Sequence, residues 1–205
     1  MIAVLDYGIG NLRSAEKAFQ HLGADASLVD DPDRAAAAAA VVLPGVGSFG
    51  RCAQALRSSG LDKAATAAIE RGVPFLGICV GFQLLYEGSD ESPTEQGLGV
   101  LPGTVRRLAE GVKRPQMQWN VLDTVGGPTG GLLAGVPSPA WVYFVHSYAP
   151  ELTAHTSSTC HYGGPVTASA EWGTVWGTQF HPEKSGSVGL GILANFVRAA
   201  TAAPR

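Results

Sequence analysis

One cysteine stands in a sequence setting that is typical of an enzyme nucleophile. Cys79 is the centre of the run Gly-Ile-Cys-Val-Gly at 77–81, between an apolar run at 73–76 and a helical pattern that starts at Phe82. Small residues two positions either side of a nucleophile characterise the strand-to-helix elbow, in which a tight turn lifts the side chain above a sheet. The positive end of the following helix would favour the thiolate. The alternative is a buried cysteine at a strand end, which the run alone does not exclude.

A histidine and a glutamate near the other end of the chain supply the groups that such a cysteine needs. His181 and Glu183 flank Pro182, after a strand-like run at 173–180. A nucleophile requires a base within hydrogen-bond reach, and the base requires a third group that holds its tautomer. In an extended segment, residues two apart share a face, so both side chains can converge on one site. His-x-Glu alone occurs often by chance, but together with Cys79 it predicts a Cys–His–Glu triad.

Hydrolysis at Cys79 would also need donors for an oxyanion. The backbone N–H of Val80 is one natural donor. The second is expected from the run Pro-Gly-Val-Gly at 44–47, where glycine allows close backbone approach and a peptide flip. The alternative for that run is an ordinary strand-ending turn.

The motifs together resemble those of the class I (triad-type) glutamine amidotransferases, and within them the glutaminase subunits of imidazole glycerol phosphate synthase. The elbow and His-Pro-Glu carry the resemblance to the wider family. The remaining motifs, spread nearly end to end, are Asp-Tyr-Gly-Ile-Gly-Asn-Leu (6–12), Leu-Pro-Gly-Val-Gly-Ser-Phe (43–49), Gly-Leu-Gly-Val (97–100), Tyr-Phe-Val-His-Ser-Tyr (143–148), Phe-His-Pro-Glu-Lys-Ser (180–185) and Asn-Phe (195–196).

The resemblance implies a glutaminase that works with a second protein. It would hydrolyse glutamine to glutamate and ammonia, and a (β/α)₈-barrel synthase subunit in a heterodimer would use the ammonia to make imidazole glycerol phosphate and aminoimidazole carboxamide ribonucleotide. No cofactor is expected, and no His, Cys, Asp or Glu group has metal-ligand spacing. The implied site residues beyond the triad are Gly47 and Val80 for the oxyanion and Gln83, Glu91, Ser147 and Tyr148 for glutamine.

The resemblance also implies a docking face formed by Asn11, Trp119, Tyr143 and Lys184. The alternatives are a core position for Trp119 and a solvated surface position for Lys184. The chain departs from the family at 116–120, where Gln-Met-Gln-Trp-Asn replaces the expected His-Met-Gly-Trp-Asn. His146 is interpreted as structural or interfacial, because no acidic residue is near it in the sequence.

Composition restricts the class of protein. A chain of 205 residues with 45% apolar residues can bury one substantial core, and we expect a single domain over 1–205. A formal net charge of −3 and no basic cluster argue against nucleic acid or a membrane as partner. Cysteines at 52, 79 and 160 are too sparse for a disulfide framework. The N-terminus lacks the pattern of a signal peptide, so a cytoplasmic location is expected.

Strand and helix patterns alternate in the first half, which predicts an α/β fold with an open, mostly parallel sheet and helices on both faces. Gly and Pro turns separate short β-like pieces in the second half, which we expect to be mainly antiparallel extensions. The predicted site lies at the carboxyl ends of the strands. The expected strands are 2–5, 26–29, 41–43, one leading into Cys79, 100–101, 105–106, 121–122, 142–145, 158–162 and 166–170, and the expected helices are 11–21, 35–40, 49–58, 61–71 and 187–200.

Three other functions compete with this one. Gly8 and Gly10 with Asp30 resemble a dinucleotide-binding fingerprint, but Arg13 stands where close packing requires the third glycine. A non-catalytic interaction subunit would not need Cys79, His181 and Glu183. The same glutaminase could also serve a different synthase.

Overall fold

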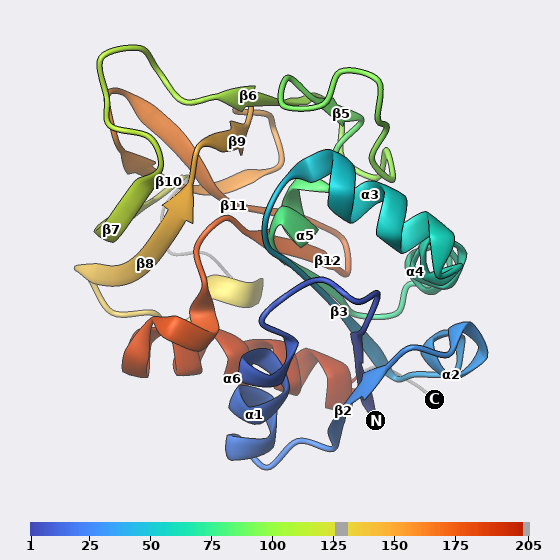
Figure 1. Ribbon diagram of the computed structural model, residues 1–205. Coiled ribbons are helices and arrows are strands. Elements are labelled where there is room, and N and C mark those ends of the chain that lie inside the picture. Colours follow the sequence, from blue (N-terminus) through green and yellow to red (C-terminus); the bar gives the residue numbers. More distant parts are fainter. Residues whose placement is uncertain (126–130, 203–205) are drawn as a thin grey trace.

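The computed structural model describes residues 1–125 and 131–202, which form a large sheet with helices on both faces (Figure 1). The sheet has nine strands in the order β2-β1-β3-β4-β12-β11-β10-β7-β8. Five of them are parallel: β2 (Ala26–Val29), β1 (Ile2–Leu5), β3 (Ala40–Gly45), β4 (Phe75–Cys79) and β12 (Val175–Thr178). The antiparallel extension consists of β11 (Pro165–Trp172), β10 (Thr156–His161), β7 (Gln116–Thr124) and β8 (Ala140–His146).

The parallel strands are short apolar runs because both of their faces are covered. Every residue of β1, β3, β4 and β12 is buried. A smaller sheet of β5 (Gly88–Ser89), β6 (Thr104–Arg107) and β9 (Tyr148–Pro150) lies beside the large one. The predicted α/β fold, with a mostly parallel sheet and antiparallel additions in the second half, is confirmed.

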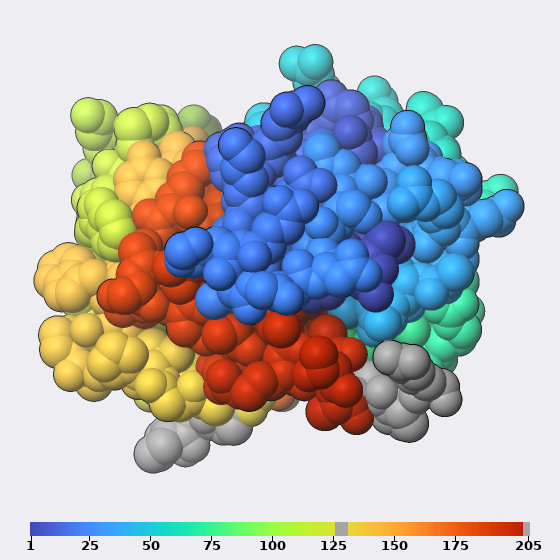
Figure 2. Space-filling view, turned by 90° about the horizontal axis from the view of Figure 1, so that it is seen from below, coloured from blue at the N-terminus to red at the C-terminus, as the bar shows by residue number. Residues whose placement is uncertain are grey.

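The helices form two layers. α1 (Leu12–His21) and α6 (Gly186–Ala202) lie side by side on one face (Figure 2), where the rings of Phe19 and Phe196 are 5.8 Å apart. α3 (Phe49–Ser58), α4 (Leu61–Glu70) and α5 (Val80–Gln83) cover the other face (Figure 1). α2 (Pro32–Ala36) contacts α4, and the 3₁₀ turns are η1 (Gly131–Leu133) and η2 (Pro182–Lys184). No described helix is long and apolar enough to cross a membrane.

Two element predictions are wrong. The alanine run predicts a helix over 35–40, but α2 ends at Ala36 and Ala40 begins β3. Ala40 pairs with Ile2 in the sheet, and this tertiary pairing outweighs the helix preference of alanine. The pair 100–101 forms no strand; instead, the N–H groups of Val100 and Leu101 both donate to the carbonyl of Leu85.

The helix that follows Cys79 is a single turn, because α5 spans only four residues. Its macrodipole is therefore smaller than that of the longer helix suggested by the apolar pattern at 82–86. Stabilisation of a thiolate must then rely more on neighbouring side chains than on the helix.

Candidate active site

Cys79 has the backbone conformation of a nucleophile elbow. It ends β4 with φ 56° and ψ −112°, and it is the only non-glycine residue with positive φ in the described ranges. Such a conformation is unfavourable for an L-residue and persists only where the surrounding structure imposes it. β4 pairs with β3 on one side and β12 on the other, so the carboxyl ends of three parallel strands meet at the sulfur.

The flanking glycines serve a purpose different from the predicted one. Neither Gly77 nor Gly81 has positive φ, so the turn itself does not require them. They are needed because α5 passes very close to the strands. A Cβ on Gly81 would lie 1.8 Å from the carbonyl oxygen of Leu43, and one on Gly77 would lie 2.8 Å from the carbonyl oxygen of Gly81. Close packing of backbone on backbone thus fixes the position of Cys79.

His181 and Glu183 form a buried pair. Nδ1 of His181 lies 2.8 Å from Oε1 of Glu183, and their side chains are 3% and 4% exposed. The connecting segment is not extended as expected. His181 precedes the 3₁₀ turn η2, and this turn brings the Glu183 carboxylate to Nδ1 of the imidazole ring. The predicted convergence occurs, but through a turn.

The surroundings of His181 favour its charged form. Burial opposes protonation, but the neighbouring Cys79 and Glu183 side chains outweigh it and raise the pKa of His181 to about 10. Nε2 is buried and makes no hydrogen bond with any described residue, so it is available to Cys79 and to a substrate. The arrangement can store a proton on His181 next to a sulfur nucleophile.

A cavity of about 280 Å³ opens above Cys79 and His181. Twelve residues line it, and eight of them are predicted site residues: Cys79, His181, Gly47, Val80, Gln83, Glu91, Ser147 and Tyr148. His146 also lines the cavity. Gly47 has φ 90°, a conformation that glycine adopts at little cost. Segments that are far apart in the sequence therefore converge on one hollow.

The predicted glutamine-binding residues are already hydrogen-bonded to the protein. Nε2 of Gln83 donates to the carbonyl of Tyr148 at 2.9 Å and to Oε1 of Gln179 at 3.0 Å. Oε2 of Glu91 accepts from the backbone N–H of Phe49 at 2.7 Å, which ties the loop to the start of α3. Oε1 of Glu91 makes no hydrogen bond with a described residue.

The sequence patterns do not assign two residues that lie at the site. Gln179 is fully buried, and its Nε2 lies 3.7 Å from Sγ of Cys79. Its position two residues before His181, at the end of a strand-like run, is the available signal. The sequence favours a structural or interfacial role for His146, but this residue lines the cavity. Its Nδ1–H donates to the carbonyl of Tyr148 at 2.9 Å, and burial lowers the pKa of His146 to about 4.

The four residues predicted to dock a partner differ in their surroundings. Trp119 is 47% exposed, so the core alternative for it is wrong. It pairs with Tyr143 across β7 and β8, with ring centroids 6.1 Å apart. The carbonyl of Tyr143 accepts from the N–H of His181 at 3.0 Å, which joins this aromatic pair to the segment of His181 and Glu183. Lys184 and Asn11 are exposed.

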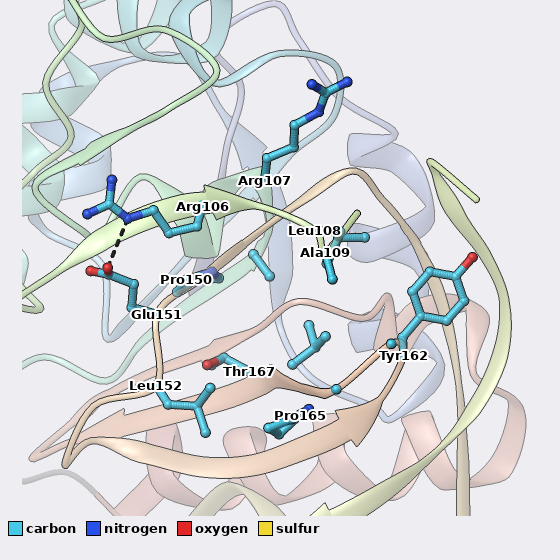
Figure 3. Close-up of a pocket in the computed structure, with 14 residues that line it drawn as sticks. Arg106, Arg107, Leu108, Ala109, Pro150, Glu151, Leu152, Tyr162, Pro165 and Thr167 are labelled. Carbon is cyan, nitrogen blue, oxygen red and sulfur yellow. Dashed lines mark hydrogen bonds and ion pairs between the residues drawn. The ribbon is translucent and has the colours of Figure 1, made fainter. Parts of the chain in front are cut away.

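A second cavity, of about 330 Å³, lies between β6, β9 and β11 (Figure 3). Its lining is mainly apolar and contains none of the predicted site residues. At its rim, Nε of Arg106 donates to Oε1 of Glu151 at 2.9 Å. The described residues contain no group of three or more His, Cys, Asp or Glu that could hold a metal ion.

Comparison with known proteins gives a consistent result. A family model described as "Glutamine amidotransferase class-I" matches residues 3–200. The imidazole glycerol phosphate synthase subunit HisH of Synechococcus sp. (strain JA-3-3Ab) is 47% identical over 201 residues, covering 96% of this chain and 92% of that protein. The subunit HisH of Moorella thermoacetica is 45% identical, covering 95% and 93%.

Solved structures show the same fold. A crystal structure of a glutamine amidotransferase superposes with a TM-score of 0.76 at 21% identity, covering 98% of both chains. A glutamine amidotransferase from Thermotoga maritima gives a TM-score of 0.67 at 15% identity, again covering 98% of both chains. Given the family match and the identity to the two HisH proteins, the chain belongs to the class I glutamine amidotransferases, in the family of HisH subunits of imidazole glycerol phosphate synthase.

Proposed function

We propose that this chain is the glutaminase subunit of an imidazole glycerol phosphate synthase, in histidine biosynthesis. It hydrolyses glutamine to glutamate and ammonia and passes the ammonia to a synthase subunit. One observation carries the chemical part of the proposal. Cys79 and His181 open into one cavity, and Glu183 holds the opposite nitrogen of His181 at 2.8 Å. The family supports the substrate class, because its members are glutamine amidotransferases.

The first half of the reaction forms a thioester. The Cys79 sulfur attacks the side-chain carbonyl carbon of glutamine, and the carbonyl oxygen becomes an oxyanion. The N–H groups of Val80 and Gly47 are the proposed donors to this oxygen. His181 then gives its proton to the departing nitrogen, the C–N bond breaks, and ammonia leaves. Glu183 stabilises the imidazolium form through Nδ1 and keeps Nε2 directed at the cavity.

The second half releases glutamate. His181, now neutral, takes a proton from water, whose oxygen attacks the thioester carbon. The C–S bond breaks and the sulfur leaves as thiolate, while the proton stays on His181. The starting ion pair is thereby restored. The raised pKa of His181 suits this cycle, because the imidazolium is stable whenever the sulfur is negative.

The ends of the substrate are assigned to polar groups around the cavity. Gln83 contacts the side-chain amide, and the backbone of Ser147 and Tyr148 binds the α-carboxylate. Glu91 receives the α-ammonium group through Oε1, while Oε2 remains bonded to Phe49. The cavity volume of about 280 Å³ is suited to a free amino acid rather than to a nucleotide.

The partner in this proposal is a (β/α)₈-barrel synthase subunit that forms a heterodimer with the chain. Ammonia that escapes into water becomes ammonium, which is not a nucleophile, so the glutaminase site must deliver it directly. The exposed Trp119 packs against the half-buried Tyr143 next to the segment of His181, and such an aromatic surface is of the kind that anchors interfaces. Lys184 and Asn11 are assigned to the same face.

The test is to mix the purified chain with candidate synthase subunits and to measure glutamate release. The proposal predicts that only the imidazole glycerol phosphate synthase subunit switches on turnover. Activation by a different synthase would support the alternative glutaminase function. Absence of turnover with every partner would support a non-catalytic interaction subunit.

A further inference from the structure

Gln179 is the polar side chain nearest to the nucleophile that the mechanism above does not use. It follows β12 directly, and its side chain is fully buried. Its backbone N–H donates to the carbonyl of Ala168 at 2.8 Å, which fixes the residue against β11. From there Nε2 reaches to 3.7 Å from Sγ of Cys79, a hydrogen-bond distance for a sulfur acceptor.

The direction of the Gln179 amide follows from its neighbours. A carbonyl oxygen can only accept, so the Gln83 atom 2.9 Å from the carbonyl of Tyr148 must be the NH₂ group. The same NH₂ group lies 3.0 Å from the Gln179 amide and must donate there too. Gln179 therefore presents its oxygen to Gln83 and its NH₂ group to Cys79. The backbone of Tyr148 thus determines which atom faces the sulfur.

We propose that Gln179 is a dedicated hydrogen-bond donor to the Cys79 sulfur and stabilises it whenever it carries negative charge. This inference rests on the proposed glutaminase function. The sulfur is negative before attack on glutamine and again when the thioester C–S bond breaks. Because α5 is a single turn, side-chain donors carry more of that task than the helix end does. Gln179 therefore supplies a side-chain donor to the sulfur from the same short connection, between β12 and η2, that carries His181.

The hydrogen bonds from Cys79 through Gln179 and Gln83 also reach Tyr148, in the region assigned to the substrate carboxylate. The carbonyl of Tyr148 accepts from Nε2 of Gln83 and from Nδ1 of His146. Movement of this segment would be transmitted through Gln83 to the amide that contacts the sulfur. Substrate that seats correctly against Ser147 and Tyr148 would therefore keep the donor to Cys79 in place.

The experiment measures the rate of Cys79 alkylation by iodoacetamide as a function of pH. Gln179→Met and Gln179→Leu both remove the donor at similar volume and add no charge beside the sulfur. Gln116→Met is the matched control, because Gln116 is an equally buried amide whose Nε2 lies 3.8 Å from a different sulfur, that of Cys160. Circular dichroism selects folded variants.

We expect the pH of half-maximal alkylation to rise by about 0.5 to 1 unit in both Gln179 variants, since a charged acceptor loses a donor. Gln116→Met should leave it unchanged. A midpoint unaltered in either folded Gln179 variant, or shifted equally in Gln116→Met, overturns the inference. The proposed function fails separately, when a glutamine-like electrophile does not label Cys79 in the wild-type chain.

Discussion

His181 and Glu183, two residues apart, are joined by a 2.8 Å hydrogen bond inside a region where both side chains are almost inaccessible to water. The 3₁₀ turn that starts at Pro182 makes this contact possible, because it brings the carboxylate of Glu183 to Nδ1 of the imidazole ring. The hydrogen bond leaves Nε2 as the nitrogen without a partner among the described residues. The neighbouring Cys79 raises the pKa of His181. The contact with Glu183 therefore sets the orientation of the His181 ring, whereas Cys79 and Glu183 together favour its charged form.

The first prediction concerns the pH dependence of stability. The pKa of His181 is raised from 6.5 to about 10 in the folded chain, so its contribution to stability is fully present below pH 6.5 and is lost as the pH rises toward 10. Glu183→Gln removes a charge that raises this pKa. Urea unfolding between pH 6.5 and 10 should therefore show a smaller decline in unfolding free energy for Glu183→Gln than for the wild-type chain. Parallel declines would show that Glu183 does not hold the proton on His181.

The second prediction concerns catalysis. Cys79→Ala should reduce glutaminase activity by roughly four to six orders of magnitude, the scale of losing a nucleophile in a triad. Synthase activity supplied with external ammonium salt should persist, because the partner's chemistry does not use Cys79. His181→Ala should behave similarly, and Glu183→Gln should be milder because only orientation and charge stabilisation weaken. Substantial glutamine turnover by Cys79→Ala would remove the nucleophile assignment.

The strain at Cys79 gives a third prediction. Its φ of 56° disfavours alanine as much as cysteine, whereas glycine tolerates it. The free energy of unfolding of Cys79→Gly should therefore exceed that of Cys79→Ala by about 1 kcal/mol. Chemical denaturation of the two inactive variants measures this difference. If Cys79→Ala is the more stable variant, the elbow is not strained.

The close approach of α5 to the sheet gives a fourth prediction. Gly81→Ala places a Cβ 1.8 Å from the carbonyl oxygen of Leu43, and backbone must shift to accommodate it. We expect a loss of more than about 2 kcal/mol in unfolding free energy together with loss of glutaminase activity. Gly191→Ala is the control, because nothing lies within 4 Å of its Cβ position and it lies inside α6, where alanine gains about 0.5–1 kcal/mol. Equal stability of the two variants would refute the packing argument.

The docking face gives a fifth prediction. Trp119→Ala should weaken the complex with the synthase subunit by more than about 1 kcal/mol if the indole is an interface anchor. Trp172→Ala provides the control, because Trp172 is 50% exposed on β11 and is not assigned to the face. Lys184→Ala should weaken the complex or uncouple glutamate release from product formation. Calorimetric titration measures the affinity, and the ratio of glutamate released to synthase product formed measures the coupling. Equal affinity of all three variants with an unchanged ratio would place the docking face elsewhere.

Much of this site could be predicted from the sequence because its residues lie in short, directional patterns. The elbow around Cys79 and the turn at His181 and Glu183 are local, and the alternation of strands and helices places their carboxyl ends at one edge of the sheet. Local patterns do not show which side chain fills the space between two strands. Gln179 contacts Cys79 because β12 and β4 are neighbours, a pairing between segments 100 residues apart.

The wrong predictions have the same origin. Alanine prefers helix, yet Ala40 pairs with β1, and no pattern within the alanine run at 35–40 predicts that pairing. The elbow pattern assigns the glycines around Cys79 to the turn, whereas the structure requires Gly81 for close approach of α5 to β3 and Gly77 for close approach of β4 to α5. The structural or interfacial role expected for His146 stays a prediction; its hydrogen-bond partner is the backbone carbonyl of Tyr148, which any residue type could have supplied.

The most direct test of the account is covalent labelling of the cysteines by a glutamine analogue that carries an electrophilic carbon, followed by mass spectrometry of peptides. The chain has three buried cysteines without disulfides, and only Cys79 lines the cavity that we assign to glutamine. We expect Cys79 alone to be labelled, and we expect excess glutamine to protect it. Labelling of Cys52 or Cys160 in preference to Cys79, or labelling that glutamine does not slow, would contradict the assignment of Cys79 as the glutaminase nucleophile.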